Sequence, residues 1–432
     1  MTSRGARTSA SWLRAGLLAA TAAAVVAHLL IAALLLERLR EGALVGDWPA
    51  FYAAGHIVRS GDGGRLYDAG AQAAAEHALF GDVAVDSFPL PAFTALVFAP
   101  LSALSFAQAY LAWLFVNLVL LSALAALAWR SLARVEMAAR VAFVGGSVIS
   151  TPVLRVLTGA QIDLFVVAAL AGCYALVRTG RPFRGGLLLA LALVKPQLLL
   201  GVLALLAVRR QWRALAGLAL AAAPLLTLPV LVTGVGGVRD QAALLASYPA
   251  SSTDHGVAAD QMVNLRGLVV GLTGSGDMRL WLPLLAVTSA VCVCAALGVW
   301  RSRLAGDAQS WALAVVLPLI CSPHVHAYTL VLLLVAGGLY LLARADAGDP
   351  LLAEAVVVAA LALTVVCLVS LLIVPIAGVA VLALFALFVT RWPRGAPLRA
   401  DAPRPIEGRA PRPVSVASGS GGRYTAADGA IV

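Results

Sequence analysis

The sequence predicts an all-α membrane protein, a polytopic bundle of helices. Hydrophobic residues make up 61% of its 432 residues, and charged residues only 12%. A soluble domain of this length could not cover so much apolar surface, because the outer layer of a soluble fold is polar. Apolar runs of about 20 residues recur along the chain, and each is long enough to cross about 30 Å of hydrocarbon. We therefore expect about 12 transmembrane segments within one domain, residues 1–390.

The apolar runs also predict where the spans and loops lie. The first run follows a short basic segment and has no cleavage site of small residues, so we interpret it as an uncleaved signal-anchor. With a cytoplasmic N-terminus, residues 39–88 and 233–280 form the two extracytoplasmic loops, the first of them with short interfacial helices. The Arg- and Pro-rich tail, 391–432, is predicted to be cytoplasmic and disordered. The predicted spans are about 15–38, 89–105, 107–128, 141–157, 161–177, 184–208, 214–232, 281–300, 309–321, 327–343, 353–372 and 374–390.

The middle of the chain allows two topologies. Simple alternation places the arginine loops around Arg134 and Arg181 outside, against the positive-inside rule. The conflict disappears if 89–128 makes one net crossing and the run broken by "VKPQ" is a re-entrant hairpin. Both versions agree after Ala214, and we favour the hairpin.

The basic charge and the cysteines indicate topology rather than a ligand. The net charge is +10, but many of the arginines lie in short loops and in the tail, so we expect no nucleic-acid partner. The five cysteines lie in or beside apolar runs, and "CVC" has no metal-ligand spacing. We predict neither a disulfide framework nor a metal site.

The segment "GDWPAFYAAGHIVRSGDGGRLYD" (46–68) is unusually polar for this chain. Its aromatic residues, among them Tyr52, suit the depth of a membrane interface. Its aspartates could be merely solvated, an explanation that fits Asp62 and Asp82 better than Asp47. Asp47 is therefore the first candidate for chemistry.

A second polar cluster, "CSPHVHAY", places two imidazoles after a proline at a helix junction. His324 and His326 could donate to a phosphate or orient a carboxylate near neutral pH. A packing role is the alternative, and it fits His324 better than His326. A zinc site would need a third nitrogen or sulfur ligand, and none stands at a useful spacing.

A third cluster contains the only lysine of the sequence, Lys195 in "LALVKPQLLL". Ionisable groups within apolar runs are costly and tend to line functional cavities, although a lysine can also extend to the interface. In "TGAQIDLF", Gln161 and Asp163 stand at a helix start, where Asp163 could simply stabilise the helix N-terminus.

Further polar candidates follow in the second predicted loop, at Gln261, Asn264 and Arg266. GxSxG, GxxxxGK[ST] and HExxH motifs do not occur. The inventory of carboxylate, imidazole, ammonium and amide groups fits a carboxylate base that deprotonates an acceptor hydroxyl. Cationic groups would then stabilise an anionic leaving group.

Five motifs in order resemble glycosyltransferase family 87, the polyprenol-phosphate-mannose-dependent α-mannosyltransferases of the integral-membrane GT-C class. The resemblance covers roughly residues 40–340. Where family members usually have "YPP", this chain has "FPLP". The motifs are the 46–68 segment, "DSFPLPAFTALVFAPLSAL", "TGAQIDLF" through "LALVKPQLLL", "DQMVNLRGLV" and "CSPHVHAYTLVLLL".

The resemblance implies a GT-C fold and inverting transfer of a hexose, typically mannose, from a polyprenyl-phosphate sugar. It assigns Asp47 as general base and places His326 near the donor phosphate, with the donor lipid-linked and no cofactor or metal required. The acceptor would be an envelope glycolipid, lipoglycan or polysaccharide, reached from the extracytoplasmic side of a bacterial plasma membrane. The substrate-binding candidates are Tyr52, His56, Gln161, Lys195, Gln261, Asn264, Arg266, His324 and His326.

Two other functions remain alternatives at the level of the sequence. A secondary transporter would place ionisable residues near the membrane midplane and show two repeated halves. A non-catalytic assembly subunit would use the polar clusters only for packing. In this chain the polar groups cluster near loops and no clear repeat is visible, which favours the transferase.

Overall fold

The computed structural model describes residues 46–81, 86–251, 257–302, 306–347 and 375–392, together with single positions at 26, 30, 33 and 37. Within these ranges the chain is all-α and has no strand, only one isolated bridge between Met262 and His326. The predicted span 353–372, nearly all of 15–38 and the tail beyond 392 lie outside the described residues.

Five of the described helical segments are long and apolar enough to cross a membrane, by length and composition. Four further apolar helices are shorter. The predicted total of 12 spans is therefore not reached in this part of the chain. The five segments are Phe106–Ser131, Ala139–Thr158, Trp212–Ser247, Met278–Arg301 and Ala327–Asp346, and the shorter helices are Pro182–Val194, Pro196–Val208, Asp307–Cys321 and Ala377–Thr390.

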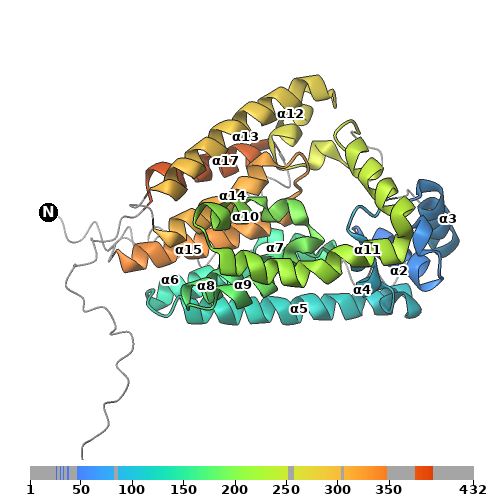
Figure 1. The fold of residues 1–432 in the computed structure, drawn as a ribbon, viewed down its shortest axis with the longest axis horizontal. Coiled ribbons are helices and arrows are strands. Elements are labelled where there is room, and N and C mark those ends of the chain that lie inside the picture. Colours follow the sequence, from blue (N-terminus) through green and yellow to red (C-terminus); the bar gives the residue numbers. More distant parts are fainter. Residues whose placement is uncertain are drawn as a thin grey trace, which may run out of the picture. The chain divides into compact units, whose positions relative to one another are not determined.

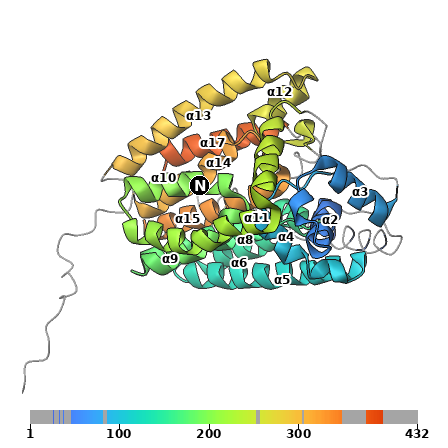
Figure 2. The same cartoon turned by 45° about the vertical axis from the view of Figure 1, so that its right-hand side comes forward.

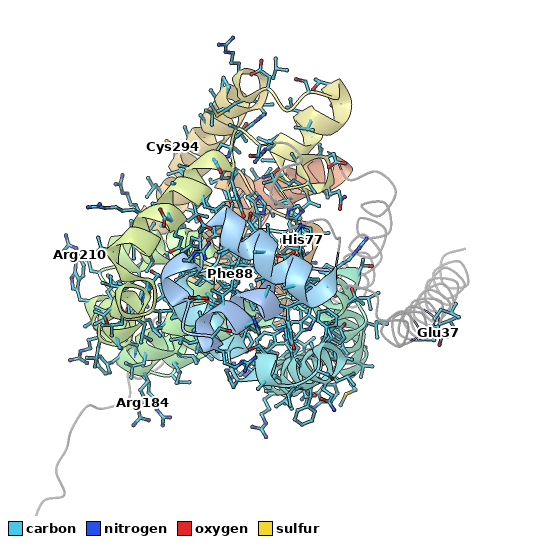
Figure 3. All side chains as sticks on the ribbon, turned by 90° about the vertical axis from the view of Figure 1, so that its right-hand side faces the viewer. Glu37, His77, Phe88, Arg184, Arg210 and Cys294 are labelled. Carbon is cyan, nitrogen blue, oxygen red and sulfur yellow. The ribbon has the colours of Figure 1, made fainter. Side chains whose placement is uncertain are left out.

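The first polar segment folds into short helices that pack on one another. They are α2 (Trp48–Arg59), the 3-10 turn η1 (Gly63–Arg65) and α3 (Ala69–Phe80). Asp68 caps α3, since its Oδ1 accepts from the backbone N–H of Ala71 at 2.6 Å. Figure 3 looks onto this part of the molecule, with His77 of α3 and the following Phe88 labelled.

The predicted span 89–105 is wrong. This segment forms the seven-residue helix α4 (Ala92–Phe98) and the turn η2 (Leu101–Ala103). A helix of this length reaches roughly 10 Å, too short to cross a bilayer. Pro91 stands at its start and Pro100 just beyond its end, because proline cannot continue a helix. Helix α4 packs on α2 instead, where Phe98 stacks on Phe51 with ring centroids 5.0 Å apart.

One long helix then leaves this region and two short ones return to it. α5 (Phe106–Ser131) begins at a capping box of Ser105 and Gln108. α6 (Met137–Val148) and α7 (Thr151–Thr158) follow in the opposite direction. The indole of Trp113, near the start of α5, donates to the carbonyl of Ala160 at 2.8 Å. Region 89–128 therefore contains one membrane-length helix, as the favoured topology requires.

The run around "VKPQ" forms a broken hairpin. α8 (Asp163–Arg178) is followed by α9 (Pro182–Leu189) with η3 (Ala190–Val194), then η4 (Pro196–Leu199) with α10 (Leu200–Val208). Gly185 packs against Cys173 in the second half of α8, whereas Lys195 bonds Asp163 at its first residue. The chain thus approaches the start of α8 and turns back at Lys195. The expected hairpin is present, with Lys195 at its tip.

The remaining helices enclose the hairpin. α11 (Trp212–Ser247) runs along α9 (Figure 1) and is kinked at Gly234, where φ is +69°. This kink falls where the sequence predicts the second loop to begin. α12 (Leu265–Thr273), α13 (Met278–Arg301) and α17 (Pro375–Thr390) pack together (Figure 2). α14 (Asp307–Cys321) leads through Ser322 and His326 into η7 (Ala327–Leu332) and α15 (Leu333–Asp346).

Candidate active site

Most of the predicted site residues meet in one cavity of about 650 Å³. Its walls come from the start of α2, the segment before α4, the end of α7, the hairpin tip, the end of α11 and the α14–η7 junction. A second cavity, of about 390 Å³, has mainly apolar walls and contains none of the predicted residues. Polar side chains lining the larger cavity are Asp47, Asp86, Ser87, Arg155, Thr158, Gln161, Lys195, Gln197, Gln241, Tyr248, Gln261, His324, His326, Tyr328 and Thr329.

Asp47 stands at the N-cap position of α2, yet its carboxylate does not cap the helix. An N-cap aspartate usually accepts from the backbone N–H groups of the first turn. Here Oδ2 of Asp47 accepts instead from Nε2 of Gln161 at 2.6 Å, across 114 residues of sequence. The carboxylate is therefore directed into the cavity.

A close approach of two glycines makes this placement possible. Gly46 has φ +52°, and a Cβ at this position would lie 2.6 Å from Cα of Gly159. Glycine satisfies both the left-handed backbone and the lack of space. The α7–α8 turn, which carries Gln161, can therefore lie directly beside Asp47.

Burial raises the pKa of Asp47 above its ordinary value of 3.8, because the cavity wall removes water from the charged form. The hydrogen bond from Gln161 and the charge of Lys195 oppose this rise, whereas the charge of Asp163 adds to it. A carboxylate with a raised pKa in a cavity binds a proton more strongly than an exposed aspartate. It is therefore a suitable general base.

Lys195 lies at the opposite side of Gln161 from Asp47. Its Nζ donates to Oδ2 of Asp163 at 2.7 Å and to Oε1 of Gln161 at 3.4 Å. It also stands 4.6 Å from the ring centroid of Tyr328, within cation–π distance. Asp163 is thus the partner of a buried lysine, more than the stabiliser of its own helix.

The two histidines lie side by side, with ring centroids 4.7 Å apart. A short pairing of backbones, in which the N–H of Val263 donates to the carbonyl of Val325 at 2.8 Å, fixes their segment beside Gln261. Nδ1 of His324 is buried and has no hydrogen-bond partner among the described residues. A buried polar atom without a partner is costly, so this nitrogen is an energetic cost of the arrangement.

Burial keeps both imidazoles neutral at neutral pH. It lowers the pKa of His326 from 6.5 to about 4, with the positive charge of Lys195 adding to the effect. The pKa of His324 is lowered well below 6.5, first by burial and then by its electrostatic interactions with the neighbouring His326, Lys195 and Arg266. Each neutral ring therefore carries one N–H, and the ring of His326 already bonds the backbone at Gln261 and Val257. A charged imidazolium is not expected at either position at neutral pH.

Asp86 is a second carboxylate in the cavity, and it is not among the residues predicted from the sequence. Burial raises its pKa, and the negative charge of Asp47 raises it further. Asp86 precedes the "FPLP" segment, which the sequence analysis interpreted as the start of a span. Once α4 is recognised as too short to cross, an aspartate in front of it becomes a candidate. Arg155, Gln197 and Gln241 share no local pattern that could have identified them.

Tyr52 and His56 lie outside this cavity. The hydroxyl of Tyr52 donates to the carbonyl of Leu104 at 2.7 Å, which ties α2 to the turn before α5. Nδ1 of His56 lies 3.2 Å from Nη2 of Arg59, one turn further along the same helix. Both residues support the first loop and neither faces the cavity with Asp47.

Asn264 and Arg266 also lie outside the cavity and hold the second loop together. Asn264 caps α12 and donates to the carbonyl of Ser322 at 2.8 Å. The guanidinium of Arg266 is buried, donates to the backbone carbonyls of Tyr248 and Ser251, and lies 4.9 Å from the ring of Trp281. Of the ten predicted residues, the cavity therefore contains Asp47, Gln161, Lys195, Gln261, His324 and His326.

The described part of the chain holds no group of three or more His, Cys, Asp or Glu side chains that could bind a metal ion. The two histidines and two aspartates of the cavity do not form such a group. The cavity brings together a half-buried carboxylate, two imidazoles and two basic side chains, Lys195 and Arg155.

The comparison with known proteins is consistent with this chemistry. The model of glycosyltransferase family 87 matches residues 88–323, more than half of the chain. The match includes Gln161, Lys195 and Gln261, and the fold brings Asp47 and His326 to them from outside it. No curated protein and no solved structure matches the chain. The chain belongs to glycosyltransferase family 87.

Proposed function

We propose that this glycosyltransferase transfers a hexose, namely mannose, from a polyprenyl-phosphate sugar to an envelope glycolipid or lipoglycan. The transfer inverts the configuration at C1 of the sugar. The observation that carries the proposal is the half-buried carboxylate of Asp47, directed into a cavity that also holds neutral imidazoles and cationic side chains. Membrane-length helices around the cavity fit a donor that is itself a lipid.

The proposed reaction has one step. Asp47 accepts the proton of an acceptor hydroxyl, and the oxygen attacks C1 of the donor sugar. The bond between C1 and the phosphate oxygen breaks, and its electron pair leaves with the polyprenyl phosphate. One base suffices, because phosphate is a good leaving group and no glycosidic oxygen needs protonation, unlike in hydrolases.

The leaving phosphate requires stabilisation of its negative charge. The imidazoles of His324 and His326 and the guanidinium of Arg155 line the same cavity and can supply it. The ammonium of Lys195 adds positive potential from behind Gln161. The proposed reaction uses no metal and no cofactor.

The distribution of arginines supports an extracytoplasmic position of the cavity in a bacterial plasma membrane. The ends of α8 and α15 away from the cavity meet where Arg178 approaches Asp346 at 3.9 Å. There too, Arg134 approaches Asp346 at 4.0 Å. At the end of α10, Arg209 donates to Ser310 at the start of α14, on the side away from Ser322. Loops rich in arginine favour the cytoplasmic side, which supports a cavity that opens to the other side.

The test is the substitution Asp47→Asn, assayed in membranes with a radiolabelled polyprenyl-phosphate mannose. The amide cannot accept the proton, so transfer to endogenous glycolipid should fall by about 10²- to 10⁴-fold. Membrane insertion and thermal stability should stay unchanged, which serves as the control. Near-normal turnover of this variant would remove Asp47 as the base and the proposed reaction with it.

A further inference from the structure

A buried ion pair stands behind the proposed base. The side chain of Lys195 is 10% exposed and that of Asp163 is not exposed at all, and their charged atoms lie 2.7 Å apart. Burying two charges is expensive, and such a pair adds little to stability compared with apolar residues of similar size. A function for the pair therefore has to be sought in what it contacts.

The contact is Gln161, whose amide lies between Lys195 and Asp47. A lysine ammonium can only donate, so Oε1 of Gln161 must face Lys195. Nε2 of the same amide then faces Oδ2 of Asp47, as the 2.6 Å distance requires. If the amide were reversed, its oxygen would face the carboxylate oxygen of Asp47, and two acceptors would meet. Its NH₂ group would face the ammonium of Lys195, and two donors would meet. Lys195 thus determines which way the amide of Gln161 points.

Asp163 in turn fixes Lys195. Its Oδ2 takes the shortest bond to the ammonium, and its Oδ1 is buried with no hydrogen-bond partner among the described residues. The lysine is also the turning point of the hairpin, where η3 ends and Pro196 begins η4. The ammonium therefore has little freedom to move toward a ligand in the cavity.

We infer that Asp163 and Lys195 form a positioning pair, which acts through Gln161 to hold Oδ2 of Asp47 and leave Oδ1 to accept the proton. This inference rests on the proposed role of Asp47 as base. It assigns Lys195 to the orientation of the base, in place of the direct contact with the donor that the sequence suggested. No described residue donates to Oδ1 of Asp47, which leaves this oxygen open to the acceptor hydroxyl.

The choice of lysine follows from the geometry. An ammonium is compact and can contact Asp163, Gln161 and the face of Tyr328 at once. A guanidinium is planar and wider, so arginine would displace the amide rather than orient it. This explains a single lysine in a chain whose other basic residues are arginines.

The test compares Lys195→Met and Lys195→Arg with the wild type, using radiolabelled polyprenyl-phosphate mannose and measuring kcat, KM for the donor and the pH profile. Both variants should lower kcat by up to about 100-fold, because a base that is misplaced by about 1 Å loses this much. The donor KM should change less than threefold. In Lys195→Met the fall in activity at low pH, the acid limb of the pH profile, should move to higher pH. The reason is that the positive charge of the lysine lowers the pKa of Asp47. Arg184→Gln, which removes an exposed cation of the same hairpin away from the cavity, is the matched control.

Other outcomes would overturn the inference. If Lys195→Met raises the donor KM tenfold or more with kcat and the acid limb unchanged, Lys195 is a donor ligand. If Lys195→Arg keeps full activity, a positive charge at position 195 is sufficient and the compact shape of the lysine is not needed to orient Gln161. An inactive Asp47→Asn variant beside fully active Lys195 variants would refute the positioning pair and leave the proposed function standing.

A double variant keeps the test valid where a single change prevents folding. Lys195→Met leaves Asp163 as an unpaired buried charge, which is strongly destabilising. Lys195→Met combined with Asp163→Asn removes both charges, and should restore insertion and thermal stability while kcat stays low. Recovery of wild-type kcat in the double variant would show that the pair is only structural.

Discussion

At the scale of single residues, the cavity works by setting the protonation of its groups through burial. Asp47 and His326 are both moved toward their neutral forms, the carboxyl by a raised pKa and the imidazole by a lowered one. The two shifts have the same main cause, because a buried group loses the water that would solvate its charge. Their consequences for catalysis differ. The raised pKa makes Asp47 a stronger base, whereas the lowered pKa leaves His326 as a neutral hydrogen-bond donor.

The raised pKa of Asp47 predicts an acid limb in the pH profile of transfer. Only the ionised carboxylate can accept the proton, so kcat/KM should fall as pH decreases through the pKa of Asp47. Because burial raises this pKa, the midpoint should lie above 3.8, the ordinary value for an aspartate. A profile measured with permeabilised membranes checks this. A limb at or below the ordinary value would show that Asp47 is not the group observed.

The lowered pKa of His326 predicts that a neutral amide can replace it in part. With a pKa of about 4, the ring acts as an N–H donor without charge at neutral pH. His326→Gln should therefore keep more transfer activity than His326→Ala. The difference between the two variants should appear in the KM for the labelled donor. Equal losses in the two variants would indicate that the ring itself, and not its N–H, is required.

At the scale of the elements, short helices and sharp turns bring the reacting groups together. Asp47 directly precedes α2, the α7–α8 turn carries Gln161, and the hairpin turns at Lys195. Each is an end of a helix, where side chains can face a cavity instead of a packed neighbour. The contacts between these ends are tight, and the glycine pair at 46 and 159 is the tightest of those beside the base.

Gly46→Ala should reduce transfer more than it reduces stability. The new methyl would meet the backbone of Gly159, and the positive φ adds strain of about 1 kcal/mol or more. The two segments would separate, and Asp47 would lose its bond to Gln161. Gly61→Ala is the matched control, because Gly61 also has a positive φ but has open space around it. Similar loss of activity in both variants would contradict the role of the close approach.

Helix α3 carries a titratable group that makes stability depend on pH. Glu76 is buried and accepts from the backbone N–H of Asp86 at 3.3 Å. Desolvation raises its pKa from 4.5 to about 7. A raised folded-state pKa means that the stabilising contribution is complete below 4.5 and is lost as pH rises through about 7.

Glu76→Gln keeps the neutral form at all pH values. The thermal midpoint of the wild-type protein in detergent should fall between about pH 5 and about pH 8, and that of the variant should fall less. A scan of both proteins at the two pH values measures this difference. An identical fall would assign the pH dependence to other groups.

At the scale of the whole molecule, the hairpin explains how the arginine-rich loops before and after it can lie on the same side of the membrane. Arg181 precedes the hairpin, Arg184 lies in the first turn of its helix α9, and Arg209 follows it. The two halves of the hairpin run to and from the cavity. A single span over 184–208 would have placed these arginines on opposite sides of the membrane. With the hairpin, all of them lie on the side away from Asp47.

Cysteine accessibility distinguishes the two topologies. In a variant without the native cysteines, Arg184→Cys and Arg213→Cys should react with a membrane-impermeant maleimide only after the cells are opened. Ser60→Cys, in the turn after α2, should react in intact cells. Labelling of one hairpin flank in intact cells and of the other only after opening would mean that the segment crosses the membrane.

The sequence by itself determined the all-α membrane class and six of the fifteen polar side chains that line the cavity. Apolar length and the rarity of ionisable groups in apolar runs are local properties, so they can be read along the chain. The structure alone decided that 89–105 is not a span, that Asp86 belongs to the cavity, and that Asn264 and Arg266 hold the loop instead of lining it. The partnership of Lys195 with Asp163 and Gln161 was equally hidden. These facts depend on contacts between residues far apart in sequence, and no local pattern encodes which helix ends meet.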